Sequence, residues 1–156
     1  MNLERIKFPS KKKYTIKEVD ILARTCLFRA GIDYLHGTGH GVGHFLNVHE
    51  GPYNQPWKPG MVHTNEPGYY ENGNFGIRIE NMLVCVQDSQ FKDFLAFENI
   101  TMFPYHKSLI DVKMLDTAEI DHINHYHEKI KQLLIPRVQD DRLALQFLDK
   151  ESGPIV

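Results

Sequence analysis

Histidines and glycines alternate over residues 36–44, and another histidine follows in residues 47–52. The first segment reads His-Gly-Thr-Gly-His-Gly-Val-Gly-His and the second reads Asn-Val-His-Glu-Gly-Pro. Glycine allows a backbone to approach another group closely. Histidine supplies neutral nitrogen ligands and a proton carrier near neutral pH. These two segments therefore predict a crowded polar site that holds a metal ion, a substrate or both.

The spacing of His36 and His40 depends on the local backbone. We expect residues 38–44 to form a strand, because each glycine in a helix costs about 1 kcal/mol relative to alanine. On a strand, His36 and His40 share a face but lie roughly 13 Å apart. Only one of them can then bind a given ion, and the other must act elsewhere on that face. His49 could return to the site through a turn or bulge.

Two glutamates offer oxygen ligands. Glu66 lies in Thr-Asn-Glu-Pro-Gly and Glu80 lies in Gly-Ile-Arg-Ile-Glu-Asn. A hairpin folded about Gly73 would bring them nearly opposite each other, with Cβ atoms roughly 5 Å apart. Carboxylates that close repel unless a cation or a proton lies between them. With His40 they form a set of one nitrogen and two carboxylates, which suits Mn²⁺, Co²⁺ or Zn²⁺.

Each of these residues also has an interpretation without a metal. A histidine in a glycine-rich segment can be a hydrogen-bonded loop residue. Glu80 can pair with Arg78 on the same face, and Glu66 before Pro-Gly can be a turn residue. From the residues alone, both interpretations of the set stay open.

The remaining chain predicts the elements that position this set. A capping box at Thr15 and Glu18 begins a helix that ends near Gly31, with a single apolar stripe. That stripe contains Ile16, Val19, Leu22, Ala23, Cys26 and Leu27. Strands are expected at residues 61–65, 75–86 and 95–103, with a tight turn at residues 72–73.

Two further helices are expected near the C-terminus. Asp116 caps the first, and Pro136 closes it. The second covers residues 139–150 and turns Leu143, Phe147 and Leu148 inward. The predicted fold class is α+β, with a mostly antiparallel sheet and flanking helices.

The composition is that of an ordinary soluble domain. Of 156 residues, 42% are hydrophobic and 24% are charged, and the net charge is −2. Nothing global indicates nucleic acid or a membrane. Cys26 and Cys85 offer no disulfide framework, which favours a reducing cytoplasm. Residues 1–13 are basic and are expected to be a loose lead-in.

Four segments together resemble aminopeptidase P, the Xaa-Pro aminopeptidase of the pita-bread metallopeptidases. They are His36-Gly-Thr-Gly-His-Gly-Val-Gly, Val48-His-Glu-Gly-Pro, Asn65-Glu-Pro-Gly-Tyr-Tyr and Gly76-Ile-Arg-Ile-Glu-Asn. The resemblance runs from about Thr15 to the C-terminus and covers the C-terminal half of the catalytic domain. It implies a partial pita-bread domain at residues 14–105 and a C-terminal helical extension packed on it at residues 106–156.

The resemblance also implies a reaction and residue roles. This family hydrolyses the bond after an N-terminal residue that precedes proline, using water activated by two metal ions, commonly Mn²⁺. His40, Glu66 and Glu80 match its histidine and glutamate ligands, and Glu66 is also its proton shuttle. His36 and His49 match residues that orient the substrate and stabilise the oxyanion. Arg78 would contact the metal ligands without binding the metal itself, and would help to hold them in place.

The chain departs from the family pattern in one respect. The family's two aspartate ligands lie upstream of these segments, and neither Asp20 nor Asp33 has the surrounding motif. We therefore expect three of five ligands here, one weak metal site or none, and negligible activity of the chain alone. We also expect an exposed apolar face that pairs with the missing N-terminal half or a second copy. A non-catalytic pita-bread binding module and a folded remnant of a split gene stay open as alternatives.

Overall fold

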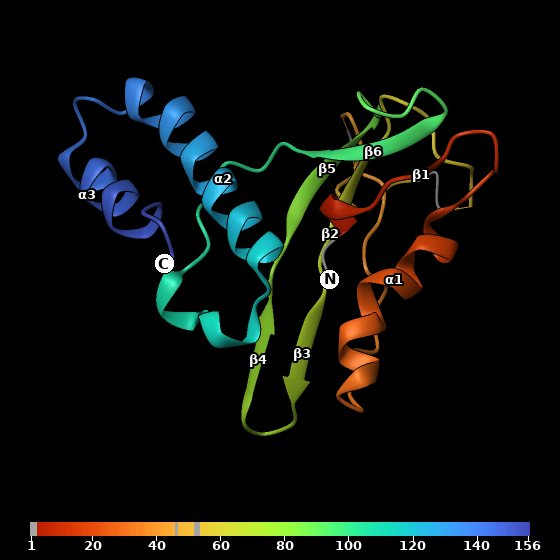
Figure 1. The fold of residues 1–156 in the computed structure, drawn as a ribbon, viewed down its shortest axis with the longest axis horizontal. Coiled ribbons are helices and arrows are strands. Elements are labelled where there is room, and N and C mark those ends of the chain that lie inside the picture. The colour runs from red at the N-terminus through yellow and green to blue at the C-terminus, as the bar shows by residue number, and fades with distance from the viewer. Residues whose placement is uncertain (1–2, 46, 52–53) are drawn as a thin grey trace. The chain divides into compact units, whose positions relative to one another are not determined.

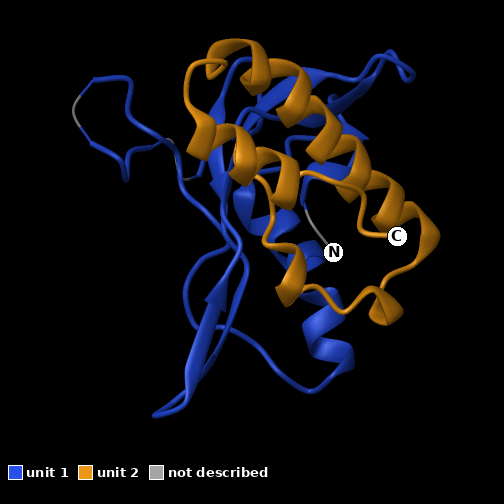
Figure 2. Ribbon diagram, turned by 90° about the vertical axis from the view of Figure 1, so that its left-hand side faces the viewer, with its two compact units in different colours: residues 1–101 blue, residues 102–156 orange. Residues whose placement is uncertain are grey.

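The computed structural model describes residues 3–45, 47–51 and 54–156, and it divides into two compact units (Figures 1 and 2). Unit 1 ends at Thr101 and unit 2 covers Met102–Val156. The predicted α+β class with antiparallel sheets is confirmed. Among the described residues, no helix is long and apolar enough to cross a membrane.

Unit 1 contains two antiparallel sheets. The larger has the strand order β1-β6-β5-β2, formed by β1 (Phe8–Pro9), β6 (Phe94–Asn99), β5 (Asn81–Gln87) and β2 (Val62–Asn65). The smaller is a hairpin of β3 (Gly68–Glu71) and β4 (Phe75–Arg78), which extends away from the larger sheet (Figure 1). Gly73 has a φ of 74° at its tip, which confirms the predicted turn.

Helix α1 (Ile16–Arg29) begins at the predicted capping box of Thr15 and Glu18. Its buried residues are Val19 and Ala23, whereas Leu22 and Cys26 of the predicted stripe are exposed. The apolar stripe is therefore wider than the face that the helix buries.

The core of unit 1 joins this helix to the larger sheet. Its buried members are Leu3, Ile6, Phe8, Val19, Ala23, Trp57, Leu83, Cys85, Leu95 and Phe97. The N-terminal segment takes part in it, because η1 (Leu3–Arg5) buries Leu3 and β1 pairs with β6. The expected loose lead-in is therefore wrong for this part of residues 1–13: its apolar side chains are needed to cover the sheet.

The predicted strand over residues 38–44 is wrong. This segment runs beside β2, where Thr38 and His40 accept backbone hydrogen bonds from Glu66 and Thr64. However, the His40 N–H donates to the hydroxyl of Thr64 instead of a backbone carbonyl, so no regular ladder forms. One isolated bridge, between Gly41 and His63, is all that the described residues of this segment contribute to a sheet.

Two other strand predictions are corrected in length. The strand expected over residues 75–86 is interrupted at Ile79 and Glu80, opposite Pro67, which has no N–H to donate to a ladder. The strand expected over residues 95–103 ends at Asn99, because the Asn99 side chain accepts the Thr101 N–H and turns the chain.

Unit 2 is helical. It contains η2 (Lys107–Leu109), η3 (Val112–Met114), α2 (Thr117–Leu134), η4 (Ile135–Arg137) and α3 (Arg142–Glu151). Asp116 caps α2 as predicted, and Glu119 completes a capping box with it. Buried Tyr126, Ile130 and Leu148 form its core.

The last helix begins later than predicted, because Asp141 caps it by accepting the N–H groups of Leu143 and Ala144. Leu148 is buried as predicted, but Leu143 is 72% exposed and Phe147 is 39% exposed. The buried face of α3 contains Leu148 and Glu151, and Leu143, five residues before Leu148, lies about 140° away from it around the helix.

Candidate metal centre

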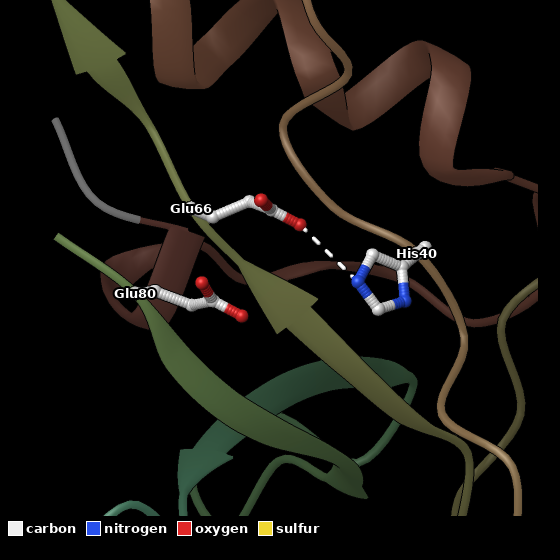
Figure 3. Close-up of side chains that lie close together, drawn as sticks. All are labelled: His40, Glu66 and Glu80. Carbon is white, nitrogen blue, oxygen red and sulfur yellow. Dashed lines mark ion pairs between the residues drawn. The ribbon is translucent and has the colours of Figure 1, made fainter. Parts of the chain in front are cut away.

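His40, Glu66 and Glu80 converge in unit 1. Each offers one nitrogen or oxygen atom, and these atoms all lie within 4.8 Å of one another. Figure 3 shows the three side chains turned toward a common point, with Nε2 of His40 lying 3.4 Å from Oε1 of Glu66. The predicted approach of these three groups is confirmed.

Strand register explains why the two glutamates face each other. Asn65 of β2 pairs with Asn81 of β5, and Gly68 of β3 pairs with Arg78 of β4. Both pairings belong to one continuous register, so Glu66 and Glu80 occupy opposite positions between them. The break that Pro67 causes in the ladder therefore lies at the site itself and leaves the register intact.

The tautomer of His40 follows from its hydrogen bond. Its Nδ1 lies 2.9 Å from the carbonyl oxygen of Gly41, which can only accept, so Nδ1 carries the proton in the neutral ring. The lone pair of Nε2 then faces the carboxylate of Glu66 at 3.4 Å. Two acceptors that face each other repel unless a proton or a cation lies between them. This geometry fits a bound cation.

Glu66 is held in place from two sides. The hydroxyl of Thr64 donates to its Oε1 at 2.9 Å, and Nε of Arg78 lies 3.9 Å from its Oε2. The Glu66 side chain is 12% exposed. Arg78 therefore lies beside Glu66.

His36 and His49 lie in different surroundings from each other. The ring of His49 lies against the ring of His40, with centroids 4.1 Å apart. His36 instead contacts Tyr70, whose hydroxyl lies 2.8 Å from Nε2 of His36. His36 and His40 thus have separate environments, although the predicted strand between them does not form.

Tyr70 connects His36 to Arg78. Nε of Arg78 donates to the hydroxyl of Tyr70 at 2.9 Å. The hydroxyl of Tyr70, and then the nearby carboxylates of Glu66 and Glu80, raise the pKa of Arg78. Sequence reasoning quoted Tyr70 within a motif but did not select it as a site residue.

The two aspartates considered as ligands are engaged elsewhere. Asp20 and Asp33 each form an ion pair with Arg24 at 2.7 Å. Burial acts to raise the pKa of Asp20, but hydrogen bonds from Arg24 and Thr38 outweigh it and leave this pKa below its ordinary value. Asp20 and Asp33 are therefore charged partners of Arg24.

A small cavity is lined in part by Gly41, which follows His40 in the chain. It has about 10 Å³ of space for a water molecule, and Trp57 and His63 are among the residues that line it. Nδ1 of His63 donates to the carbonyl of Thr64 at 2.5 Å, and burial lowers the pKa of His63 to about 4. Nε1 of Trp57 can donate and Nε2 of His63 can accept, and neither has a partner among the described residues. The cavity suits one bridging water.

With this geometry established, similarity to known proteins identifies the family. Residues 6–87 match the metallopeptidase family M24, and residues 93–155 match the C-terminal region of the same peptidase group. The chain belongs to metallopeptidase family M24. The aminopeptidase P resemblance of the four segments agrees with this membership.

Relatives of this chain include Xaa-Pro aminopeptidases. The chain is 42% identical over 169 residues to Xaa-Pro aminopeptidase 1 of Dictyostelium discoideum, covering 99% of this chain and 27% of the relative. It is 45% identical over 149 residues to aminopeptidase P1 of Lotus japonicus, covering 88% of this chain and 22% of the relative. The chain thus spans about a quarter of the length of these relatives.

A solved structure shares nearly the whole fold of this chain. The X-prolyl aminopeptidase of Caenorhabditis elegans, described as a cytosolic enzyme with a di-nuclear active site, superposes with a TM-score of 0.91 at 36% identity. That superposition covers 98% of this chain and 26% of the C. elegans chain. The predicted pita-bread portion of the fold is therefore confirmed.

Proposed function

We propose that this chain contributes three ligands to the metal site of an Xaa-Pro aminopeptidase. The observation that carries the proposal is the convergence of His40, Glu66 and Glu80, with ligand atoms within 4.8 Å of one another. Nε2 of His40 and one oxygen from each glutamate would hold the ion. One nitrogen and two carboxylates suit Mn²⁺ first, and Zn²⁺ or Co²⁺ as alternatives.

The complete site would hold two ions and need two aspartates from another part of the domain. Asp20 and Asp33 are engaged with Arg24, which supports an origin of those ligands outside these 156 residues. The chain alone would then hold one weakly bound ion, and would hydrolyse Xaa-Pro peptides negligibly. Hydrolysis would be negligible because the reaction uses water activated by two metal ions, and a single ion lacks the second.

The side chains around the ligands would divide the catalytic work. A bound ion lowers the pKa of water and polarises the scissile carbonyl. Glu66 would take the proton from the attacking water and pass it to the leaving amine. His36 and His49 would orient the peptide and stabilise the developing oxyanion. Arg78 would hold both Glu66 and the hydroxyl of Tyr70 in place.

The proposed partner is the remaining half of an M24 catalytic domain, in trans or within a longer product. Large apolar side chains of unit 1 are exposed on α1 and the β3–β4 hairpin, including Ile21, Phe28, Phe75 and Ile77. Such residues would be covered in the complete domain. A homodimer is the alternative occupant of this surface, and the cytoplasm is the proposed location, as for the C. elegans relative.

Metal titration tests the proposed ligands. Mn²⁺ binding to the chain is measured by calorimetry and by the paramagnetic signal of free Mn²⁺. We expect His40→Ala and Glu80→Gln to raise the dissociation constant by at least about tenfold. His44→Ala is the matched control, because His44 is an exposed histidine of the same segment. Equal binding by the wild type and His40→Ala would contradict the metal site.

Complementation tests the reaction. The aspartate-bearing half of the Dictyostelium relative is added as a separate polypeptide, and Xaa-Pro hydrolysis is measured with Mn²⁺. Restored hydrolysis supports the peptidase. Binding of that half or of peptide without hydrolysis favours a non-catalytic module, and neither binding nor hydrolysis favours a folded remnant. Robust turnover by the pure chain would contradict the proposal that it needs a partner.

A further inference from the structure

We propose that Asp20 and Arg24 on α1 are positioning residues for the metal centre, holding the backbone of residues 34–38, which carries His36 and leads directly to His40. This inference rests on the proposed function for its consequence, but not for its geometry. Neither residue contacts the ligand atoms. Their effect is transmitted through the hydrogen bonds described below.

Arg24 holds the start of the segment. Its Nη1 donates to the carbonyl oxygen of Tyr34 at 2.6 Å, and its Nη2 donates to the carbonyl oxygen of His36 at 2.7 Å. The guanidinium also lies over the ring of Tyr34, 4.0 Å from its centroid. The Arg24 side chain thus fixes the backbone at both Tyr34 and His36.

Asp20 holds the next residue and orients Arg24. Its Oδ1 accepts from the backbone N–H of Thr38 at 3.0 Å and from the Thr38 hydroxyl at 2.5 Å. Its Oδ2 accepts from Nε of Arg24 at 2.7 Å. The Asp20–Arg24 pair therefore contacts the chain at residues 34, 36 and 38, immediately before His40.

Thr38 passes this constraint to the second ligand. Thr38 is 1% exposed, and its hydroxyl also lies 2.6 Å from that of Tyr34. Its carbonyl oxygen accepts the N–H of Glu66 at 2.7 Å. The position of Glu66 relative to His40 thus depends on the residue that Asp20 holds.

The type of each residue matters for this arrangement. Five N–H groups in a planar fork allow Arg24 to reach carbonyl and carboxylate oxygens together, and a lysine ammonium cannot reproduce that geometry. The Arg24 and Asp20 side chains are 11% and 26% exposed, so solvent screens this ion pair less than a surface pair. These features favour a fixed segment over a mobile one.

Amide hydrogen exchange tests the positioning directly. In Arg24→Lys, we expect the N–H groups of Thr38 and Glu66 to exchange at least about tenfold faster. The Cys85 N–H, which donates to the carbonyl of Met61 at 2.9 Å, should change by less than about twofold. Arg29→Lys makes the same change at an exposed position of α1 and should leave all three rates unaltered.

A second pair of variants avoids dependence on Arg24, whose substitution could prevent folding. Thr38→Val removes the hydroxyl that donates a hydrogen bond to Asp20, whereas Thr38→Ser keeps this hydroxyl. We expect Thr38→Val to weaken Mn²⁺ binding by at least about tenfold and Thr38→Ser to restore it to within about threefold of the wild type. A purely structural role of Thr38 would lower stability without this separation in Mn²⁺ affinity.

The outcomes separate this inference from the proposed function. Lack of Mn²⁺ binding by the wild type would refute the metal site, and the exchange rates would still decide whether Asp20 and Arg24 hold the segment. Unchanged exchange at Thr38 and Glu66 in Arg24→Lys would overturn the inference. Equal acceleration at Cys85 would also overturn it, because it would indicate general destabilisation. Equal Mn²⁺ affinities of Thr38→Val and Thr38→Ser would refute the transmission to the ligands.

Discussion

Gly39 lies between the two histidines whose separate positions the site requires. A Cβ atom added there would overlap the carbonyl oxygen of Thr64 and would lie 2.7 Å from Cε1 of His63. We expect Gly39→Ala to push residues 38–40 away from β2 and to lower the free energy of unfolding by about 1–3 kcal/mol. It should also weaken Mn²⁺ binding more than its effect on stability alone explains. Urea unfolding and Mn²⁺ titration measure both effects.

Gly37 supplies the matched control. A Cβ atom there would lie 3.8 Å from its nearest neighbour, the carbonyl oxygen of Gly39, which is an ordinary contact. Gly37→Ala should therefore change stability by less than about 0.5 kcal/mol. Equal losses in the two variants would show that close approach to β2 is not what requires glycine at position 39.

At the residue scale, the sequence predicted the positions of those side chains that are fixed by the strand register of the hairpin. Glu66 and Glu80 lie opposite because their register about Gly73 is symmetric. Tyr70 and Thr38 were not selected, because their roles depend on partners 34 and 18 residues away. Hydrogen bonds from hydroxyl and backbone groups leave no periodic signal in a sequence.

At the element scale, the start of α1 determines whether Asp20 and Arg24 face the right segment. Thr15 accepts the Lys17 N–H at 3.2 Å, and Glu18 accepts the Thr15 N–H at 2.7 Å. We expect Thr15→Ala to lower the free energy of unfolding by about 1 kcal/mol, because N–H groups of the first turn lose their partner. Urea unfolding followed by circular dichroism measures this loss.

Thr25→Ala is the control for that substitution. Thr25 lies within α1, and its hydroxyl donates to the carbonyl of Ile21, which already accepts within the helix. Alanine there should be neutral or slightly stabilising. A loss at position 25 as large as that at position 15 would contradict the capping explanation.

Capping boxes and turn glycines predicted helix starts and the hairpin well, because these signals are local. Strand lengths were less predictable. The expected strand over residues 75–86 was broken by Pro67, which belongs to the opposite strand. The segment over residues 38–44 was expected to be a strand because its glycines disfavour a helix, but a side-chain hydroxyl took the place of a ladder acceptor. In both segments, strand formation depends on residues of the neighbouring strand.

At the scale of the whole molecule, each unit has its own core, and that of unit 2 contains a buried histidine. His127 is 0% exposed. Its Nε2 accepts the Tyr105 N–H at 3.1 Å, so Nδ1 carries the proton and faces the carbonyl of Gly153 at 3.4 Å. Burial lowers the pKa of His127, with Lys107 opposing and Glu151 favouring protonation. The folded unit therefore holds this ring neutral.

The pH dependence of stability follows from that lowered pKa. Below about pH 6.5 the unfolded chain binds a proton at His127 that the folded chain does not, so the free energy of unfolding falls on acidification. The loss begins near the unfolded pKa, has a limiting slope of about 1.4 kcal/mol per pH unit, and stops below the folded pKa. Urea unfolding by circular dichroism between about pH 7.5 and pH 5 measures it.

His127→Gln should be less stable than the wild type at neutral pH, and its stability should depend less on pH. His125→Gln, at an exposed position of the same helix, should keep the wild-type dependence. If His127→Gln loses as much stability on acidification as the wild type, other groups control the acid sensitivity of the chain.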